Sequence, residues 1–194
     1  MNALQATLAA LALAATTAAP AAQANDYEAS MRDYLESEVL LWVFDGVVID
    51  AIRAQNEAHA GMTQARINTL DAQWQEEVGT ASHPLVDQVL NNPASMYLTV
   101  QMNNSAGAVT EIFLMDAHGL NVAATGPTSD YWQGDEAKFR ETYRVGPGAV
   151  HVGEVELDES TQTYQGQVSL SVLDPDTKEV IGAVTVGLNA ELLY

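Results

Sequence analysis

The sequence predicts an α+β domain in which a long N-terminal helix and shorter helices pack on a roughly five-stranded, mostly antiparallel sheet. Two observations carry this prediction. Apolar residues recur every three or four positions from Asp26 to about Ala58, which is the period of an amphipathic helix. After Gly107 the pattern changes to short alternating runs separated by Gly, Asp and Pro turns, which is typical of antiparallel strands. We expect a helical part at 25–104 and a sheet part at 105–194, both within one domain.

The first residues do not belong to this domain. Leu4 to Ala15 is an Ala/Leu-rich apolar run, shorter than the roughly 20 residues that span a bilayer. It leads to Ala22-Gln23-Ala24, a small-x-small cleavage pattern, although no Lys or Arg precedes the run. We predict a signal peptide at 1–24, cleaved after Ala24, and a periplasmic or secreted chain at 25–194. An uncleaved anchor is the alternative.

The helical part begins with one long helix. Its apolar face runs from Tyr27 to Ile52, and only Gly46 interrupts it, at a cost of about 1 kcal/mol relative to Ala. Val39 to Ile52 is the most apolar stretch of this helix, but Asp45 and Asp50 fall within it. It therefore predicts a buried helix face and no membrane span.

Three shorter helices follow. Thr63 caps the first of them, whose apolar face uses Ile67, Leu70 and Trp74. The other two are expected at Pro84 to Leu90 and at Pro93 to Met102. Each has a Pro near its start, where the missing N–H is harmless.

In the sheet part, the residue pattern predicts five strands, at Val109–Asp116, Leu120–Thr125, Ala149–Leu157, Tyr164–Leu173 and Val180–Leu188. The first two form a hairpin, and a short helix is expected at Asp135–Tyr143. Along the fourth strand, apolar residues share one face while Gln and Ser residues share the other. One sheet face is therefore apolar, and the N-terminal helices are the cover available for it.

An aromatic pair lies in the polar stretch between the hairpin and the short helix. Tyr131 and Trp132 stand among Ser, Asp, Gln and Gly, where large aromatic side chains are unusual. One interpretation is a plug that seals one end of the sheet. The other is a loop that covers a bound ligand.

The amino-acid composition limits the classes of partner that this chain can bind. The formal net charge is −19 and the pI is near 4.1, with seven dispersed basic residues. Nucleic acid and anionic membrane surfaces are poor candidates for partners, because their affinity comes largely from Lys and Arg contacts. The acidity fits a well-hydrated surface. The chain has no Cys and forms no disulfide.

Three passages, at 112–119, 129–136 and 181–188, together with the long leading helix, carry a family resemblance. From Asp26 to Leu193 the chain resembles the extracellular Cache sensor domain (PDC-type, PAS-like) in its single-module form. The resemblance implies a PAS-like sheet, a small ligand such as a carboxylate or amino acid beneath the covering loop, and a homodimer through the leading helix. No second membrane helix or output domain follows Tyr194, so we expect a separate partner, a membrane receptor or kinase, to transmit the signal.

The candidate ligand site is built around the aromatic pair and comprises Asp130, Tyr131, Trp132, Lys138, Arg140 and Asp158. Tyr131 and Trp132 supply an apolar wall with a phenol O–H and an indole N–H. The resemblance places at Asp158 an acidic group that pairs with a ligand amine, and a solvated strand edge is the alternative there. Glu154 and Glu156 share that strand face and are expected to be solvated.

Anion recognition needs a donor, and Lys138 and Arg140 lie nearest to the loop. A surface ion pair on the short helix is the alternative for both. Amino-acid-binding relatives carry an Arg just before the Trp of this region. Here Asp130-Tyr131 occupies that stretch, which weakens the amino-acid interpretation.

No catalytic or metal centre is predicted. His59, His83, His118 and His151 are scattered without metal-ligand spacing, and no strand-to-helix elbow presents a Ser nucleophile. We therefore expect neither an enzyme nor a cofactor, with an unrecognised hydrolase as a minor alternative. The main hypothesis is an exported sensor that binds a small polar metabolite under the aromatic loop. The alternative is a structural or interaction module of the same fold with a filled pocket.

Overall fold

The computed structural model describes residues 21–158 and 163–193, as α1(Ala21–Ser37), η1(Val39–Leu41), α2(Gly46–Ala58) and the further elements given below. The first twenty residues of the predicted signal peptide lie outside this range. Its expected cleavage point, after Ala24, falls within α1, and cleavage stays a prediction. Over the described ranges no helix is both long and apolar enough to cross a membrane.

The single long helix expected between Asp26 and Ala58 is wrong, because the chain breaks into α1, η1 and α2. Asp45 fixes the start of α2: its backbone is extended and its carboxylate accepts a 3.0 Å hydrogen bond from the N–H of Val47. This is N-cap geometry, which starts a helix. Gly46 is therefore the first residue of α2 and does not interrupt a longer element.

The next helices are α3(Gln64–Glu77), α4(Pro84–Leu90) and α5(Pro93–Asn104), which start where Thr63 and the two prolines predicted. Helix α5 continues past its expected end at Met102. The Thr63 hydroxyl accepts from the N–H of Arg66 and caps α3. At the other end of α3, one carboxylate oxygen of Glu77 accepts from the N–H groups of Leu85 and Val86, at 2.7 and 3.2 Å. This buried carboxylate fixes the start of α4 against the end of α3.

The sheet is fully antiparallel and has six strands: β1(Val109–Met115), β2(Asn121–Ala124), β3(Val150–Val152), β4(Glu156–Asp158), β5(Thr163–Leu173) and β6(Val180–Asn189). The strand order is β2-β1-β6-β5-β3, and β4 also pairs with β5. The expected third strand is divided at 153–155 into β3 and β4. The short helix α6(Ala137–Arg140) is shorter than expected.

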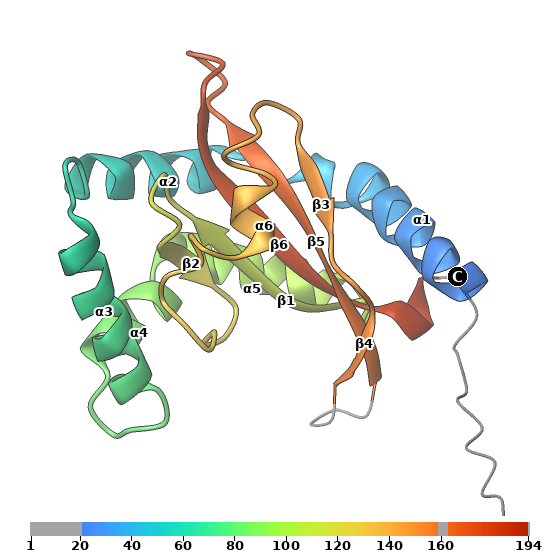
Figure 1. Cartoon of the computed structure of the whole chain (residues 1–194), viewed down its shortest axis with the longest axis horizontal. Coiled ribbons are helices and arrows are strands. Elements are labelled where there is room, and N and C mark those ends of the chain that lie inside the picture. Colours follow the sequence, from blue (N-terminus) through green and yellow to red (C-terminus); the bar gives the residue numbers. More distant parts are fainter. Residues whose placement is uncertain (1–20, 159–162, 194) are drawn as a thin grey trace, which may run out of the picture.

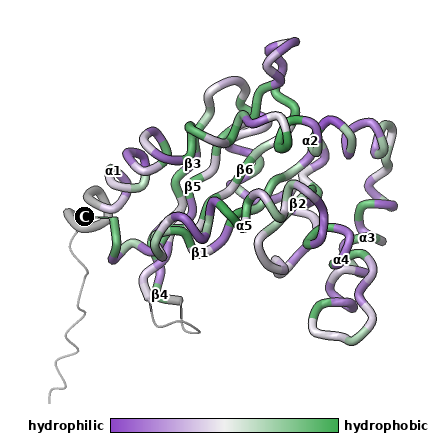
Figure 2. Tube along the Cα trace, turned by 180° about the vertical axis from the view of Figure 1, so that it is seen from behind, coloured by the Kyte–Doolittle hydropathy of each residue, from purple (hydrophilic) through white to green (hydrophobic). Residues whose placement is uncertain are grey.

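The two sheet faces have different covers. Helices α1, α2 and α5 pack on the apolar face, with a core formed by Met31, Ile52, Leu98, Leu114, Val168, Leu170, Val184 and Val186. A second apolar cluster joins α3 and α4 to β1, β2, the aromatic loop and α6. Figure 1 shows α3 and α4 at the β2 end and α1 at the opposite end, and in Figure 2 the apolar positions concentrate along the strands. The predicted α+β class is confirmed.

Candidate functional site

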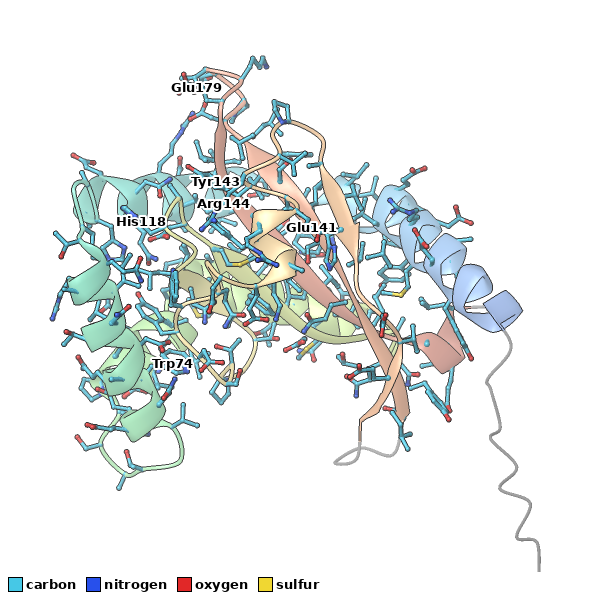
Figure 3. All side chains as sticks on the ribbon, in the orientation of Figure 1. Trp74, His118, Glu141, Tyr143, Arg144 and Glu179 are labelled. Atoms are coloured by element: carbon cyan, nitrogen blue, oxygen red, sulfur yellow. The ribbon has the colours of Figure 1, made fainter. Side chains whose placement is uncertain are left out.

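The aromatic loop, residues 128–134, is fixed to α3. One carboxylate oxygen of Asp71 accepts from the N–H groups of both Tyr131 and Trp132, each at 2.9 Å. The Trp74 indole, seen beside the loop in Figure 3, donates to the carbonyl of Thr128 at 2.8 Å. A charged acceptor and a buried indole therefore hold the loop backbone in one position.

The two predicted aromatic residues pack inward. Tyr131 is 2% exposed and stacks on the Trp74 ring at a centroid distance of 5.5 Å. Burial raises the pKa of the Tyr131 phenol well above its ordinary value, and the nearby Asp116 carboxylate adds to this. Trp132 is half-buried, and its indole N–H donates to the carbonyl of His118 at 2.9 Å. Their role in holding a ligand stays a prediction.

Two glycines allow the loop to lie against the β1–β2 hairpin. Gly119 has a φ of +83°, and a Cβ there would lie 2.6 Å from the Gly134 Cα. A Cβ on Gly134 would lie 2.8 Å from the His118 carbonyl oxygen. The backbones meet through a 2.7 Å hydrogen bond from Gln133 N–H to the Gly119 carbonyl. Only residues without a side chain permit this approach.

The other predicted site residues are not brought together. The Asp130 carboxylate accepts from Gln75 and Ser129 at the outer edge of the loop. Arg140 is exposed on α6. Asp158 ends β4 opposite Thr163, and its side chain lies outside the described part of the chain.

Lys138 is the predicted basic residue that faces the sheet. Its ammonium lies 5.4 Å from the centroid of the Phe113 ring on β1. It also bonds to the Glu136 carboxylate at 2.9 Å and the Gln133 amide oxygen at 3.2 Å. The surface ion pair that we expected as an alternative for Lys138 thus involves Glu136 and coexists with a cation–π contact over the sheet.

The sheet face beneath α6 is polar but partly buried. Phe113, Thr185 and Ser169 occupy neighbouring positions on β1, β6 and β5. The two hydroxyls share a 2.9 Å hydrogen bond and are fully buried. In the next row, the buried Ser171 hydroxyl has no hydrogen-bond partner among the described residues. Sequence alternation identified this as the polar face but did not reveal its burial.

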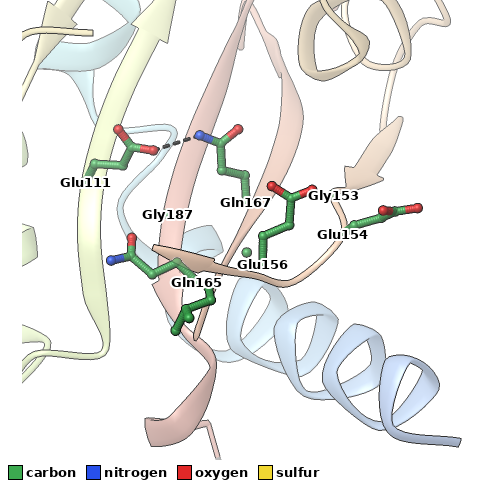
Figure 4. Close-up of a pocket in the computed structure, with 9 residues that line it drawn as sticks. Glu111, Gly153, Glu154, Glu156, Gln165, Gln167 and Gly187 are labelled. Atoms are coloured by element: carbon green, nitrogen blue, oxygen red, sulfur yellow. Dashed lines mark hydrogen bonds between the residues drawn. The ribbon is translucent and has the colours of Figure 1, made fainter. Parts of the chain in front are cut away.

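An acidic groove continues this face beyond α6 (Figure 4). It has a volume of about 480 Å³ and is lined by the carboxylates of Glu111, Glu154 and Glu156 and the amides of Gln165 and Gln167. Gln167 donates to Glu111 at 2.7 Å. Glu154 and Glu156 are exposed, as expected, and no described residue donates a hydrogen bond to either. Three carboxylates thus line the groove, and those of Glu154 and Glu156 have no donor from the described residues.

Sequence reasoning missed Glu111 as a lining residue. It lies on β1, and the strand order places β6 between β1 and β5. Gly187 on β6 lies between Glu111 and Gln167, and a Cβ there would lie 2.6 Å from the Glu111 Cγ. The small residue in the central strand therefore lets the two side chains meet. The Gly in an otherwise β-branched strand was the available signal.

A buried carboxylate joins the hairpin to α2. Asp116 is fully buried, and its Oδ1 accepts from the N–H groups of His118 and Leu120 at 2.8 and 3.0 Å. Its Oδ2 accepts from the Gln55 amide at 3.0 Å and lies 2.7 Å from His59 Nδ1. Within the described residues, no group of three or more His, Cys, Asp and Glu side chains could hold a metal ion.

These features define a PAS-like sheet domain with a polar face that is only partly covered. No protein-family model matches this chain. No curated protein matches it either.

Solved structures do match. The ligand-binding domain of the Campylobacter jejuni chemoreceptor Tlp3, in complex with 4-methylisoleucine, is 10% identical with a TM-score of 0.40, covering 86% of this chain and 61% of that one. The V. cholerae histidine kinase DctB sensor domain is 12% identical with a TM-score of 0.35, covering 89% and 58%. The ligand-binding domain of the Pseudomonas aeruginosa PAO1 amino acid chemoreceptor PctC, in complex with GABA, is 14% identical with a TM-score of 0.40, covering 81% and 63%.

These three structures are sensory or ligand-binding domains of two chemoreceptors and a histidine kinase. The likeness is one of general fold at low identity. The chain spans about three fifths of the length of these structures.

Proposed function

We propose that this chain is an exported, non-enzymatic sensor-type domain that binds a small polar metabolite on the uncovered part of its sheet. The observation that carries the proposal is the acidic groove, in which Glu154 and Glu156 have no hydrogen-bond donor from the described residues. Carboxylates that share a groove repel one another, and a protonated amine relieves this repulsion. The ligand class is therefore a small molecule that carries an ammonium group.

An amino-acid-like ligand fits the surroundings of the groove better than a simple dicarboxylate. Lys138 lies over Phe113, and Glu111 precedes Phe113 by two residues on the same face of β1, a separation of about 7 Å along the strand. A ligand amine would pair with the groove carboxylates while a ligand carboxylate would approach Lys138. Because Glu136 already neutralises Lys138, a ligand without an amine gains little there.

Calorimetric titration of the purified chain tests this proposal with three probes: putrescine, γ-aminobutyrate and succinate. We expect saturable binding of at least one amine and none of succinate. Glu156→Gln should weaken amine binding at least tenfold, since hydrogen bonds to charged groups contribute about 1.5–3 kcal/mol. Glu76→Gln, which removes the same charge from an exposed position of α3, should leave it unchanged. Succinate binding more tightly than both amines would contradict the proposal.

Signalling would require a partner, and exposed apolar side chains offer a surface for one. Leu41 and Phe44, between α1 and α2, are 79% and 43% exposed, and Met96 and Val100 on α5 are 61% and 53% exposed. The Tyr97 hydroxyl donates to the Trp42 carbonyl at 3.4 Å and joins these two regions. We propose that this surface forms the homodimer at the N-terminal helices, or meets a membrane receptor or kinase.

The second candidate function is an interaction module with a filled pocket. The packing of Tyr131 on Trp74 and the bond from Trp132 to His118 favour it, because both aromatic side chains are already occupied. This candidate predicts no saturable binding of any probe and no change in melting temperature with ligand. It also predicts that the apolar surface around Leu41 accounts for the whole function.

A further inference from the structure

A second groove lies apart from the acidic one. It runs between α2 and the α4–α5 pair, with β2 adjoining, elements that lie side by side in Figure 2. Its volume is about 810 Å³, and its walls are mainly apolar: Ala51, Ala54 and Ala58 from α2, then Val89, Pro93 and Val122. Pockets that hold small ligands are typically about 300–1,000 Å³ and mostly apolar, with a few placed polar groups. No residue of the acidic groove lines this one.

His59 supplies one such polar group. Its Nδ1 lies 2.7 Å from Asp116 Oδ2, and the Asp116 carboxylate already accepts from two backbone N–H groups and an amide. A carboxylate has no proton to donate, so His59 Nδ1 carries the proton and Nε2 is an acceptor in the neutral ring. The His59 side chain is 16% exposed, and the described residues provide no partner for Nε2.

Gln55 supplies a second acceptor. Its amide nitrogen donates to Asp116 Oδ2 at 3.0 Å and to the Asn121 carbonyl at 3.2 Å. Both amide protons are thus committed to protein acceptors, and the amide oxygen remains for a ligand. Asp50, which also lines the groove, lies 3.7 Å from the Arg53 guanidinium. His59 Nε2 and the Gln55 amide oxygen therefore favour a ligand that donates hydrogen bonds.

We propose that this groove binds a neutral small molecule with an apolar ring and a hydroxyl head, of the phenol class, whose O–H donates to His59 Nε2. The three alanines on one face of α2 leave room for the ring. The proposal is independent of ligand binding in the acidic groove. The backbone of His59 accepts from His118 Nε2 at 3.1 Å, and His118 contacts Trp132, so the bound head group would lie close to the attachment point of the aromatic loop.

The test uses 4-ethylphenol and its hydroxyl-free counterpart ethylbenzene, titrated into the full chain and followed by NMR of the imidazole nitrogens. We expect saturable binding of 4-ethylphenol with a shift of the His59 Nε2 resonance. Ethylbenzene should bind about three- to tenfold more weakly, the value of one hydrogen bond. His59→Asn retains a donor toward Asp116 but lacks Nε2. It should weaken the binding of 4-ethylphenol by a similar factor.

Groove-filling variants keep the test decisive if His59→Asn fails to fold. Ala54→Leu places a larger side chain at an exposed position that lines the groove, and should weaken the binding of 4-ethylphenol at least tenfold. Ala65→Leu makes the same change at an exposed position of α3 and should have no effect. Absence of saturable binding, equal affinity for the two probes, or wild-type affinity in Ala54→Leu would overturn the proposal.

Discussion

Replacement of Asp116 by Ala should be among the most damaging single changes in this chain. The carboxylate is fully buried and accepts hydrogen bonds from two backbone N–H groups and from Gln55, with His59 Nδ1 as a fourth neighbour. Removing the acceptor leaves buried donors unsatisfied, and each such donor costs about 1–3 kcal/mol. Partial access of water to the exposed side of His59 reduces the sum. We therefore expect a loss of about 3–5 kcal/mol in the free energy of unfolding.

Urea denaturation followed by tryptophan fluorescence measures this loss directly. Asp135→Ala is the matched control, because that carboxylate is exposed in the same loop-rich region. Its effect should remain within about 0.5 kcal/mol. A loss below about 1 kcal/mol for Asp116→Ala, with an unchanged denaturant slope, would refute the reasoning that this carboxylate organises the hairpin.

Three further predictions concern the aromatic loop, the ion pair between Arg53 and Asp174, and the apolar surface around Leu41. Gly134→Ala would place a Cβ against the hairpin backbone, and should lower the free energy of unfolding by about 1–3 kcal/mol in urea. Hydrogen bonds from Arg53 at 2.6 Å hold the pKa of Asp174 well below its ordinary value. The ionised Asp174 therefore stabilises the folded state above about pH 4, and this stabilisation is lost as the pH falls. Below about pH 5, the melting temperature of Asp174→Asn should depend less on pH than that of the wild-type chain. Leu41→Glu should shift the proposed homodimer toward monomer in light scattering.

Each of these has a matched control. Gly126 has open space around the position of a Cβ, so Gly126→Ala should be tolerated. Asp135→Asn should retain the wild-type acid dependence of melting, and Val145→Glu, at another exposed apolar residue, should leave the oligomeric state unchanged. Equal behaviour of test and control in any pair would contradict the corresponding argument.

Local signals predicted most of the fold. Helix α4 begins at Pro84 and ends at Leu90, as expected, because Pro at the first helical position is a strong boundary. The break before Gly46 was missed because Asp45 was interpreted as a polar interruption of an apolar face. An Asp directly before a Gly and two Val residues is an N-cap signal, and it was available in the sequence.

The site was less accessible to prediction because it depends on contacts far apart in sequence. The loop with Tyr131 was located, but Asp71, sixty residues earlier, holds it. Likewise, Glu154 and Glu156 were predicted as a solvated strand edge, while the groove exists because strand order brings Glu111 opposite them. Alternation identifies the face on which a side chain lies, and only the tertiary arrangement identifies its neighbours.

The hairpin turn between β1 and β2 connects the two sides of the molecule. Asp116 binds α2 through Gln55 and His59, while the His118 carbonyl accepts from Trp132 in the aromatic loop. The loop cannot separate from this turn without breaking the 2.7 Å bond from Gln133 to Gly119. A displacement of α2 would therefore disturb the aromatic loop, and a displacement of the loop would disturb α2. The apolar surface around Leu41 immediately precedes α2, so this turn links the sheet face to the helix that follows the surface we propose for a partner.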